Sequence, residues 1–139
     1  MISGKYDFSL DTKNRIFVPA KLRESLGEQI VMVRGIDECV SVYPAERWEN
    51  FCERLESLPQ TQVRHVKRFL FSSAVECKID GQGRVILPSS LRDYAKIEKC
   101  VIILGVGDHA EIWSDSVWTA REAEQDVAAM EEMLVQLGF

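Results

Sequence analysis

The sequence has no long apolar run, few histidines and no closely spaced cysteines, and each absence excludes a class of protein. No stretch approaches the roughly 18 to 20 apolar residues that a membrane-spanning helix needs. The first residues, Met1 to Asp7, lack the apolar segment that is typical of a signal peptide. We therefore expect a cytoplasmic protein that does not contact a membrane.

The cysteines and the two histidines are too scattered to indicate a metal site or a redox pair. No Cys-x-x-Cys pair occurs, and neither His65 nor His109 has other ligands beside it in the sequence. Neither histidine lies in a motif for nucleophilic catalysis. We expect reduced thiols, no metal, no cofactor, no small-molecule substrate and no enzymatic activity. The cysteines are Cys39, Cys52, Cys77 and Cys100.

What the sequence does contain is an uneven distribution of charge. The 139 residues are 46% hydrophobic and 28% charged, which is ordinary for a globular protein, and their net charge is -5. Residues 1–23 have five basic and two acidic side chains, whereas residues 108–139 have one basic and eight acidic side chains. Such asymmetry is typical of a protein with one surface for an anion and an acidic tail elsewhere.

The chain also contains an internal repeat. Residues 11–19 align with residues 80–88 at an offset of 69, and both segments begin with Asp-x-x-x-Arg and end with proline. Further matches, at offsets of 69 and then 70, are Leu22-Arg23 with Leu91-Arg92, Val42-Tyr43 with Ile112-Trp113, and Trp48 with Trp118. We infer that each half has the same order of structural elements.

Within each half the sequence predicts a strand, a tight turn, a second strand, a short helical turn and a further hairpin. Asn14 and Gly83 occupy the same position before the arginine, and both residue types tolerate positive φ, so a left-handed turn residue is expected there. The predicted later hairpins join residues 30–33 with 40–43 and residues 100–104 with 111–113. The fold class is therefore α+β with a mainly β core.

Helices are predicted after each of these hairpins. One begins near Pro44, and residues 61–70 can form another with a basic polar face. A long amphipathic helix is predicted from Ser114 to the end of the sequence, with a stripe that packs in the core or on another subunit. The stripe consists of Trp118, Val127, Met130, Leu134 and Leu137.

A glycine pattern after the strand at 100–104 imitates a dinucleotide-binding fingerprint. Gly105, Gly107 and Ala110 have the required spacing, but such a motif should open a helix. Here it leads into residues 111–113, which resemble a strand, so we interpret it as a hairpin turn.

The Asp-x-x-x-Arg pair is notable because it occurs twice, each time on a turn between strands. The simpler interpretation is two loop salt bridges, Asp11 with Arg15 and Asp80 with Arg84, worth about 0 to 1 kcal/mol each if exposed. The functional interpretation is that each carboxylate orients a guanidinium toward phosphate or the O6/N7 edge of guanine. The loop residues alone leave both interpretations open.

Taken together, these motifs resemble the MraZ family of bacterial regulators, which consist of two tandem SpoVT-AbrB type modules. The resemblance covers almost the whole chain. It rests on Gly4, residues 11–15 and 18–23, Val42-Tyr43-Pro44 with Trp48, Glu76-Cys77, residues 80–84, Leu87-Pro88, Leu91-Arg92, Ile112-Trp113 with Trp118, and Leu137-Gly138-Phe139. Asn14 departs from the family, which usually has glycine there.

The resemblance implies a fold in which tandem swapped-hairpin modules form a pseudo-dimeric β-barrel with flanking helices and a long C-terminal helix. Chains of this kind assemble into a homo-oligomeric ring. The corresponding segments are residues 5–47 for module 1, 48–74 for a helical linker, 76–119 for module 2 and 120–139 for the C-terminal helix.

The resemblance also implies a nucleoid-associated transcription regulator that binds double-stranded DNA at short G-containing direct repeats. These repeats lie upstream of the division and cell-wall gene cluster, including the regulator's own gene. Arg15 and Arg84 would read bases, and Asp11 and Asp80 would orient them. Phosphate contacts are expected from Lys5, Lys13, Lys21 and Arg23.

Two further expectations concern which module contacts DNA and what the alternative function would be. The first loop has more basic residues near it in sequence, whereas the second has only Lys78 and Arg92, so the N-terminal module is expected to dominate DNA contact. The alternative function is a protein-interaction module, because swapped-hairpin domains also occur in antitoxins whose tails bind a partner protein.

Overall fold

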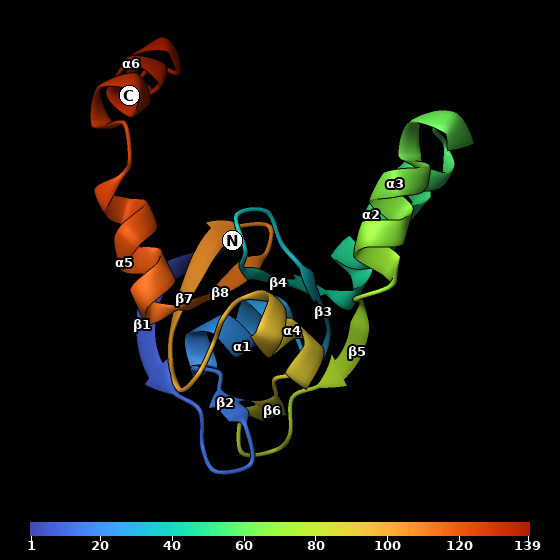
Figure 1. Cartoon of the computed structure of the whole chain (residues 1–139), viewed down its shortest axis with the longest axis vertical. Coiled ribbons are helices and arrows are strands. Elements are labelled where there is room, and N and C mark those ends of the chain that lie inside the picture. The colour runs from blue at the N-terminus through green and yellow to red at the C-terminus, as the bar shows by residue number, and fades with distance from the viewer.

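Each half of the chain folds into the same succession of elements in the computed structural model, which describes all of residues 1–139 (Figure 1). The first half contains β1 (Ile2–Ser9), β2 (Arg15–Phe17), α1 (Ala20–Leu26), β3 (Gln29–Arg34), β4 (Val40–Pro44), α2 (Ala45–Glu56) and α3 (Gln60–Phe71). The second half contains β5 (Val75–Lys78), β6 (Arg84–Ile86), α4 (Ser89–Tyr94), β7 (Cys100–Gly107), β8 (Ala110–Ser114), α5 (Asp115–Ala123) and α6 (Val127–Gln136). The predicted α+β fold and the repeated order of elements are confirmed.

The two halves exchange strands rather than folding side by side. The main sheet has six antiparallel strands in the order β1-β7-β8-β4-β3-β5, and β2 pairs with β6 in a separate ribbon. In the main sheet, β1 of the first half pairs with β7 of the second, while β5 of the second half pairs with β3 of the first. Neither half therefore completes its sheet alone.

An approximate two-fold axis relates the halves. In the ribbon Ile16 faces Val85, and in the main sheet Ser41 faces Glu111. Each of these pairs joins equivalent positions of the repeat, which is the arrangement expected where a symmetry axis passes between two antiparallel strands. The tandem halves thus pair as two subunits of a dimer would.

The strands do not close into the expected barrel. β1 and β5 are the two edges of the main sheet, and β2–β6 remains a separate ribbon at one end of the molecule (Figure 1). The chain leaves each edge strand through a tight turn at residues 11–14 or 80–83, and the three-residue strands β2 and β6 then hydrogen-bond to each other. Strands this short do not bridge the two sheet edges, so the sheet stays open.

The core lies between the main sheet, the ribbon and the short helices α1 and α4. Leu22 of α1 and Leu91 of α4 are 1% and 0% exposed, and they occupy equivalent positions of the repeat. Fully burying a leucine stabilises the fold by about 1.5 to 3 kcal/mol. Both helices begin directly after a proline, Pro19 or Pro88, whose restricted φ suits a helix start.

The longer helices lie at the end of the molecule opposite the ribbon, with α2 and α3 on one side and α5 and α6 on the other (Figure 1). Trp48 of α2 packs against Phe71 of α3 with ring centroids 6.0 Å apart, and Leu55 and Val63 are buried. The predicted helix within residues 61–70 is confirmed as part of α3. No helix is both long enough and apolar enough to cross a membrane.

The prediction of one continuous C-terminal helix is wrong. Residues 124–126 separate α5 from α6, and the Asp126 carboxylate accepts a hydrogen bond from Ala129 N at 3.0 Å. Aspartate in this position satisfies a free N–H group at a helix start, so it favours a new helix over continuation of the old one.

The glycine pattern at Gly105 is a hairpin, as predicted, because β7 turns directly into β8. Gly105 also permits a close approach of β1. A Cβ atom there would lie 2.5 Å from Ser3 Cα, which is too close for any side chain. All four cysteines are free.

Candidate nucleic-acid interface

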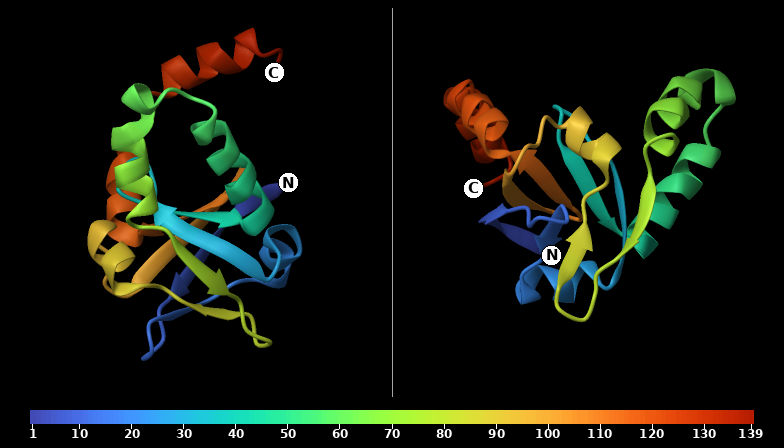
Figure 2. Two further views of the ribbon diagram at one scale, coloured as in Figure 1. Left: turned by 90° about the vertical axis from the view of Figure 1, so that its right-hand side faces the viewer. Right: turned by 60° about the horizontal axis from the view of Figure 1, so that its bottom comes forward.

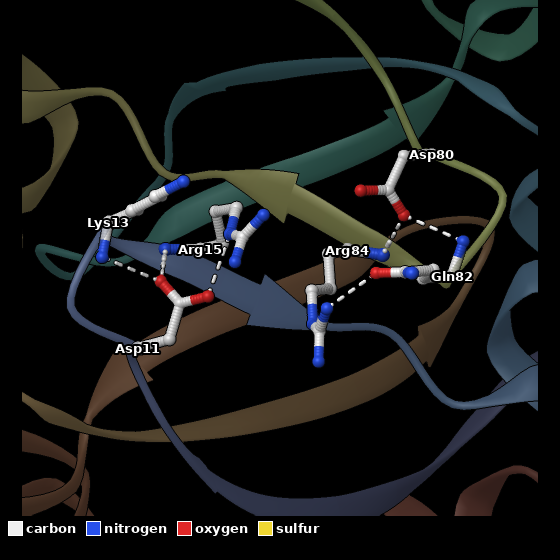
Figure 3. Close-up of polar contacts among 6 residues, drawn as sticks. All are labelled: Asp11, Lys13, Arg15, Asp80, Gln82 and Arg84. Atoms are coloured by element: carbon white, nitrogen blue, oxygen red, sulfur yellow. Dashed lines mark hydrogen bonds and ion pairs between the residues drawn. The ribbon is translucent and has the colours of Figure 1, made fainter.

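The two Asp-x-x-x-Arg loops have the same backbone geometry (Figure 3). In the first loop, Asp11 Oδ1 accepts hydrogen bonds from the backbone N–H groups of Lys13 and Arg15, both at 2.9 Å. Asp80 Oδ1 accepts the two equivalent bonds in the second loop, also at 2.9 Å. A short acceptor that bonds N–H groups two and four residues later holds a tight turn. This requirement explains why aspartate opens both loops.

The residue before each arginine has positive φ, as predicted, with Asn14 at 57° and Gly83 at 81°. The carbonyl of each of these residues accepts a hydrogen bond from the other half of the chain. Val18 N donates to Gly83 O at 2.7 Å, and Leu87 N donates to Asn14 O at 2.9 Å. The loops are therefore fixed to each other across the approximate two-fold axis.

The Gly83→Ala substitution is expected to lower the free energy of unfolding by about 1 to 2 kcal/mol, because left-handed backbone is unfavourable for alanine. A Cβ atom at Gly83 would also lie 3.0 Å from Arg23 Cζ. The matched Asn14→Gly substitution should change the unfolding free energy by less than about 1 kcal/mol, since glycine accepts the same φ. Urea denaturation at one fixed chain concentration measures the unfolding free energy of both variants. An equal loss of stability in the two variants would contradict the explanation by left-handed backbone.

The arginine side chains are held differently in the two loops. Arg15 Nε donates to Asp11 Oδ2 at 2.7 Å, which confirms the first predicted salt bridge. The second predicted salt bridge is wrong, because Arg84 Nη1 donates instead to the Gln82 side-chain oxygen at 2.6 Å. The second loop has glutamine where the first has Lys13, and the amide supplies a nearby acceptor. Each guanidinium keeps further N–H groups for an external acceptor.

The backbone N–H of Arg15 lowers the pKa of Asp11, with further lowering by the Arg15 guanidinium and by Lys13 N. The backbone N–H of Arg84 lowers the pKa of Asp80 in the same way. A lowered pKa in the folded state means that folding favours the ionised carboxylate. The stabilisation is fully present above about pH 4 and is lost as the pH falls through the lowered values. The loops therefore keep their form throughout the neutral range.

Both arginines lie on the outer face of the β2–β6 ribbon. Arg15 pairs with Ile86, and Phe17 pairs with Arg84, while the alternate residues face the core. Phe17 and Ile86 are 41% and 60% exposed. These two side chains were not predicted as part of the site, although strand alternation places them on the same face as the arginines. The ribbon thus presents two cations and two apolar groups together.

The three lysines expected at phosphates do not all lie near the loops. Lys13 is in the first loop and exposed. Lys21 is exposed on α1, and Lys5 lies within β1, opposite Leu104, outside both loops. The structure therefore brings Lys13 to the arginines but gives Lys5 no direct place beside them.

Arg23 belongs to the second loop in space, although it is near the first in sequence. It lies against Gly83, and its Cζ is 5.8 Å from the centroid of the Phe17 ring. Arg23 therefore adds positive charge to the second loop, not to the first loop as its position in the sequence predicted. Exchange of the hairpins is the reason, because it places α1 of the first half beside the loop of the second.

The acidic part of the chain lies far from these loops. Both loops project from the ribbon end of the molecule, whereas α5 and α6 are at the opposite end (Figure 1, and Figure 2, left). Residues 115–139 contain six acidic side chains and one basic side chain. A polyanion at the ribbon therefore avoids the negative charge of the tail.

Comparison with known proteins finds one family twice in the chain. The family model described as "MraZ protein, putative antitoxin-like" matches residues 1–69 and again residues 70–136. Each match contains one Asp-x-x-x-Arg loop.

Three relatives share the printed name "Transcriptional regulator MraZ". The Desulfitobacterium hafniense protein (strain DSM 10664 / DCB-2) is 44% identical over 143 residues, which cover all of both chains. The Heliobacterium modesticaldum protein is 44% identical over 139 residues, covering 99% of this chain and 96% of its own. The Caldanaerobacter subterraneus subsp. tengcongensis protein is 45% identical over 130 residues, covering 92% and 91%.

Proposed function

Because the chain belongs to the MraZ family of transcriptional regulators, with two tandem MraZ domains, we propose that it binds double-stranded DNA through its β2–β6 ribbon. The targets are short G-containing direct repeats upstream of the division and cell-wall gene cluster, including its own gene. It acts in the cytoplasm at the nucleoid.

The observation that carries this proposal is the outer face of the ribbon. Arg15 and Arg84 lie there on paired strands, each beside a rigid loop, and both loops project from the same end of the molecule. The unused N–H groups of the two guanidiniums form a pair of forks that suits guanine O6 and N7 or phosphate. A purely structural role for the loops would require the aspartates that hold the turns, but it would not require an arginine on the outer face of each strand.

The dimensions of DNA support the same site. The major groove admits a two-stranded β-ribbon, and the side chains on the outer face of such a ribbon reach base edges. Arg15 and Arg84 then read guanine, while Asp11 holds the first fork and Gln82 the second. Phe17 and Ile86 offer apolar contact to thymine methyl groups.

Contacts to the backbone surround these base contacts. Lys13 in the first loop and Arg23 beside the second bind phosphates, whereas Lys21 on α1 and Lys5 on β1 contribute more remotely. Several copies of the chain in a ring engage successive repeats, so that modest affinities combine through effective concentration. This combination overcomes the repulsion expected from a net charge of -5.

We keep the module boundaries that the resemblance implied. Module 1 spans residues 5–47, module 2 spans residues 76–119, and residues 48–74 connect them as a helical linker. Residues 120–139, the C-terminal segment, contain the end of α5 and all of α6. Strand exchange makes the two modules one folding unit, so we expect neither to fold without the other.

The proposal is tested by measuring binding of the purified protein to DNA from upstream of its own gene, at several salt concentrations. We expect log affinity to fall linearly with log salt, and the upstream DNA to bind at least about 10³-fold more tightly than scrambled DNA of equal length. Equal affinity for the two DNAs at every salt concentration would refute sequence-specific binding.

The Lys13→Ala substitution is expected to weaken binding to all DNA sequences by a similar factor and to reduce the salt slope by about 1 for each lost phosphate contact. Lys13 is exposed in the first loop and makes no side-chain bond within the chain. Its removal should therefore leave the loop itself intact. Arg64→Ala, which removes an exposed positive charge on α3 at the end of the molecule opposite the ribbon (Figure 1), is the control and should leave the slope unchanged.

A further inference from the structure

The second loop has an amide side chain at the position where the first loop has a lysine. Lys13 and Gln82 are equivalent in the repeat, at an offset of 69, and both are exposed. Their backbones are held in the same way, because each N–H donates to the aspartate that opens its loop, at 2.9 Å in both loops. The two side chains therefore start from equivalent places on the ribbon but differ in chemistry.

The hydrogen bond to Arg84 determines which end of the Gln82 amide is free (Figure 3). Arg84 Nη1 lies 2.6 Å from Gln82 Oε1. Because a guanidinium has donors and no acceptor, the amide must turn its oxygen, not its nitrogen, toward Arg84. The amide nitrogen makes no hydrogen bond within the chain. Gln82 Nε2 therefore keeps two N–H groups for an external acceptor.

The two arginines also keep different edges of their guanidiniums free. Asp11 holds Arg15 at Nε, which leaves the edge formed by Nη1 and Nη2. Gln82 holds Arg84 at Nη1, which leaves the edge formed by Nε and Nη2. Each of these edges has two N–H groups that suit guanine O6 and N7. Only in the second loop is a further side-chain donor hydrogen-bonded to the arginine itself.

The acceptor that suits this extra donor is a base rather than a phosphate. A charged donor forms the stronger bond with phosphate, and the first loop has such a donor in Lys13. A neutral amide gains less there. The bond to Arg84 keeps Gln82 within about one base step of the arginine, a step being roughly 3.4 Å along a strand. In the major groove both purines present N7 as an acceptor, whereas cytosine presents a donor.

We propose that Gln82 is a second base-reading residue, which donates an amide N–H to N7 of the purine next to the guanine that Arg84 reads. This inference rests on the proposed binding of DNA by the ribbon. It gives the two loops different tasks. The first loop reads one guanine through Arg15 and adds a phosphate contact from Lys13, whereas the second loop reads two neighbouring bases.

Two substitutions separate reading a base from holding Arg84. Gln82→Glu keeps the length of the side chain and an acceptor for Arg84, but its carboxylate has no N–H to donate. Gln82→Ala removes both the acceptor and the donor. Gln82 is exposed and its turn is held through its backbone N–H, so both variants should fold. Circular dichroism checks that they do.

The test combines these variants with DNA in which N7 of one purine is replaced by carbon. 7-Deazaguanine or 7-deazaadenine replaces each purine of the repeats in turn, in the DNA from upstream of the chain's own gene, and titration measures affinity. The guanine of Arg84 is the position at which the Arg84→Ala protein no longer responds to the replacement. At the neighbouring purine, we expect the replacement to weaken binding of the unchanged protein about 2- to 12-fold, the value of one hydrogen bond.

The Gln82→Glu protein gives the decisive result. It is expected to respond normally at the guanine of Arg84 and not at all at the neighbouring purine. Its added negative charge also repels phosphates, but that repulsion lowers affinity for substituted and unsubstituted DNA by the same factor, so the comparison removes it. Gln82→Ala should likewise lose the response at the neighbouring purine. Lys13→Ala is the matched control from the first loop and should keep the response at every purine.

An equal response of the Gln82→Glu and unchanged proteins at the neighbouring purine would overturn the proposal, because Gln82 would then only hold Arg84. A response of the unchanged protein at no purine beside the guanine of Arg84 would overturn it as well. Equal affinity of the unchanged protein for upstream and scrambled DNA would instead refute sequence-specific binding itself. The failure of this inference is thereby distinguished from the failure of the proposed function.

Discussion

Replacing both ribbon arginines, in the Arg15→Ala, Arg84→Ala double variant, is expected to abolish sequence-specific DNA binding. Each bidentate contact between arginine and guanine is worth about 1 to 3 kcal/mol, so each single variant should bind the specific site roughly 5- to 150-fold more weakly. The two guanidiniums lie on separate strands and have separate acceptors, Asp11 and Gln82, so their effects should combine. Equilibrium titration of upstream and scrambled DNA measures the loss.

The residual binding of the double variant is as informative as the loss. Because the phosphate contacts remain, affinity for scrambled DNA should fall much less than affinity for the upstream site. Arg121→Ala removes one exposed positive charge at the far end of the molecule and serves as the control. Near-normal specific affinity of the double variant would refute base reading by the ribbon.

The Gly105→Ala substitution is expected to lower the free energy of unfolding by about 1 to 3 kcal/mol or more, which is more than the loss expected for Gly83→Ala. The new Cβ would lie 2.5 Å from Ser3 Cα and 2.6 Å from Ser3 C. These are backbone atoms of the paired strand, which cannot rotate away as a side chain does. The only relief is to separate β1 from β7, at the cost of the hydrogen bonds between the two halves.

Hydrogen exchange together with urea denaturation distinguishes this mechanism from general destabilisation. The amides of β1 should lose protection in the Gly105→Ala protein before those of β3 and β4 do. Gly81→Ala is the matched control, because a Cβ there meets no atom within 4 Å. It should cost less than about 0.5 kcal/mol. Equal stability of the two variants would show that β1 does not depend on the close approach.

Local sequence patterns predicted much of the fold. The positions of the hairpins, the helix at α3 and the positive φ of Asn14 and Gly83 follow from periodicity and residue type, which act over a few neighbouring residues. The first Asp–Arg pair was predictable for the same reason, because both partners lie on one turn. The repeat then allowed each feature of one half to be expected in the other.

Features that depend on the pairing of distant segments were not predictable from those patterns. The position of Arg23 beside Gly83 follows only from the exchange of strands. The close approach of Ser3 to Gly105 has the same origin, and no local signal at either residue indicates the other. The Arg84–Gln82 bond was missed because the loops were treated as equal, although Gln82 replaces Lys13. The break before α6 depended on Asp126 as a helix cap within an apparently continuous stripe.

The approximate two-fold axis through Ile16 and Val85 has a further consequence. In a dimer of identical chains, any change on one side of the axis appears on the other as well. Here both sides are encoded in one chain, so Asn14 and Gly83, or Lys13 and Gln82, differ independently. The two loops of the ribbon are therefore not equivalent. A molecule that binds DNA in the reversed orientation makes a different set of contacts. A fused pair of modules is thereby suited to tandem sites that all point the same way.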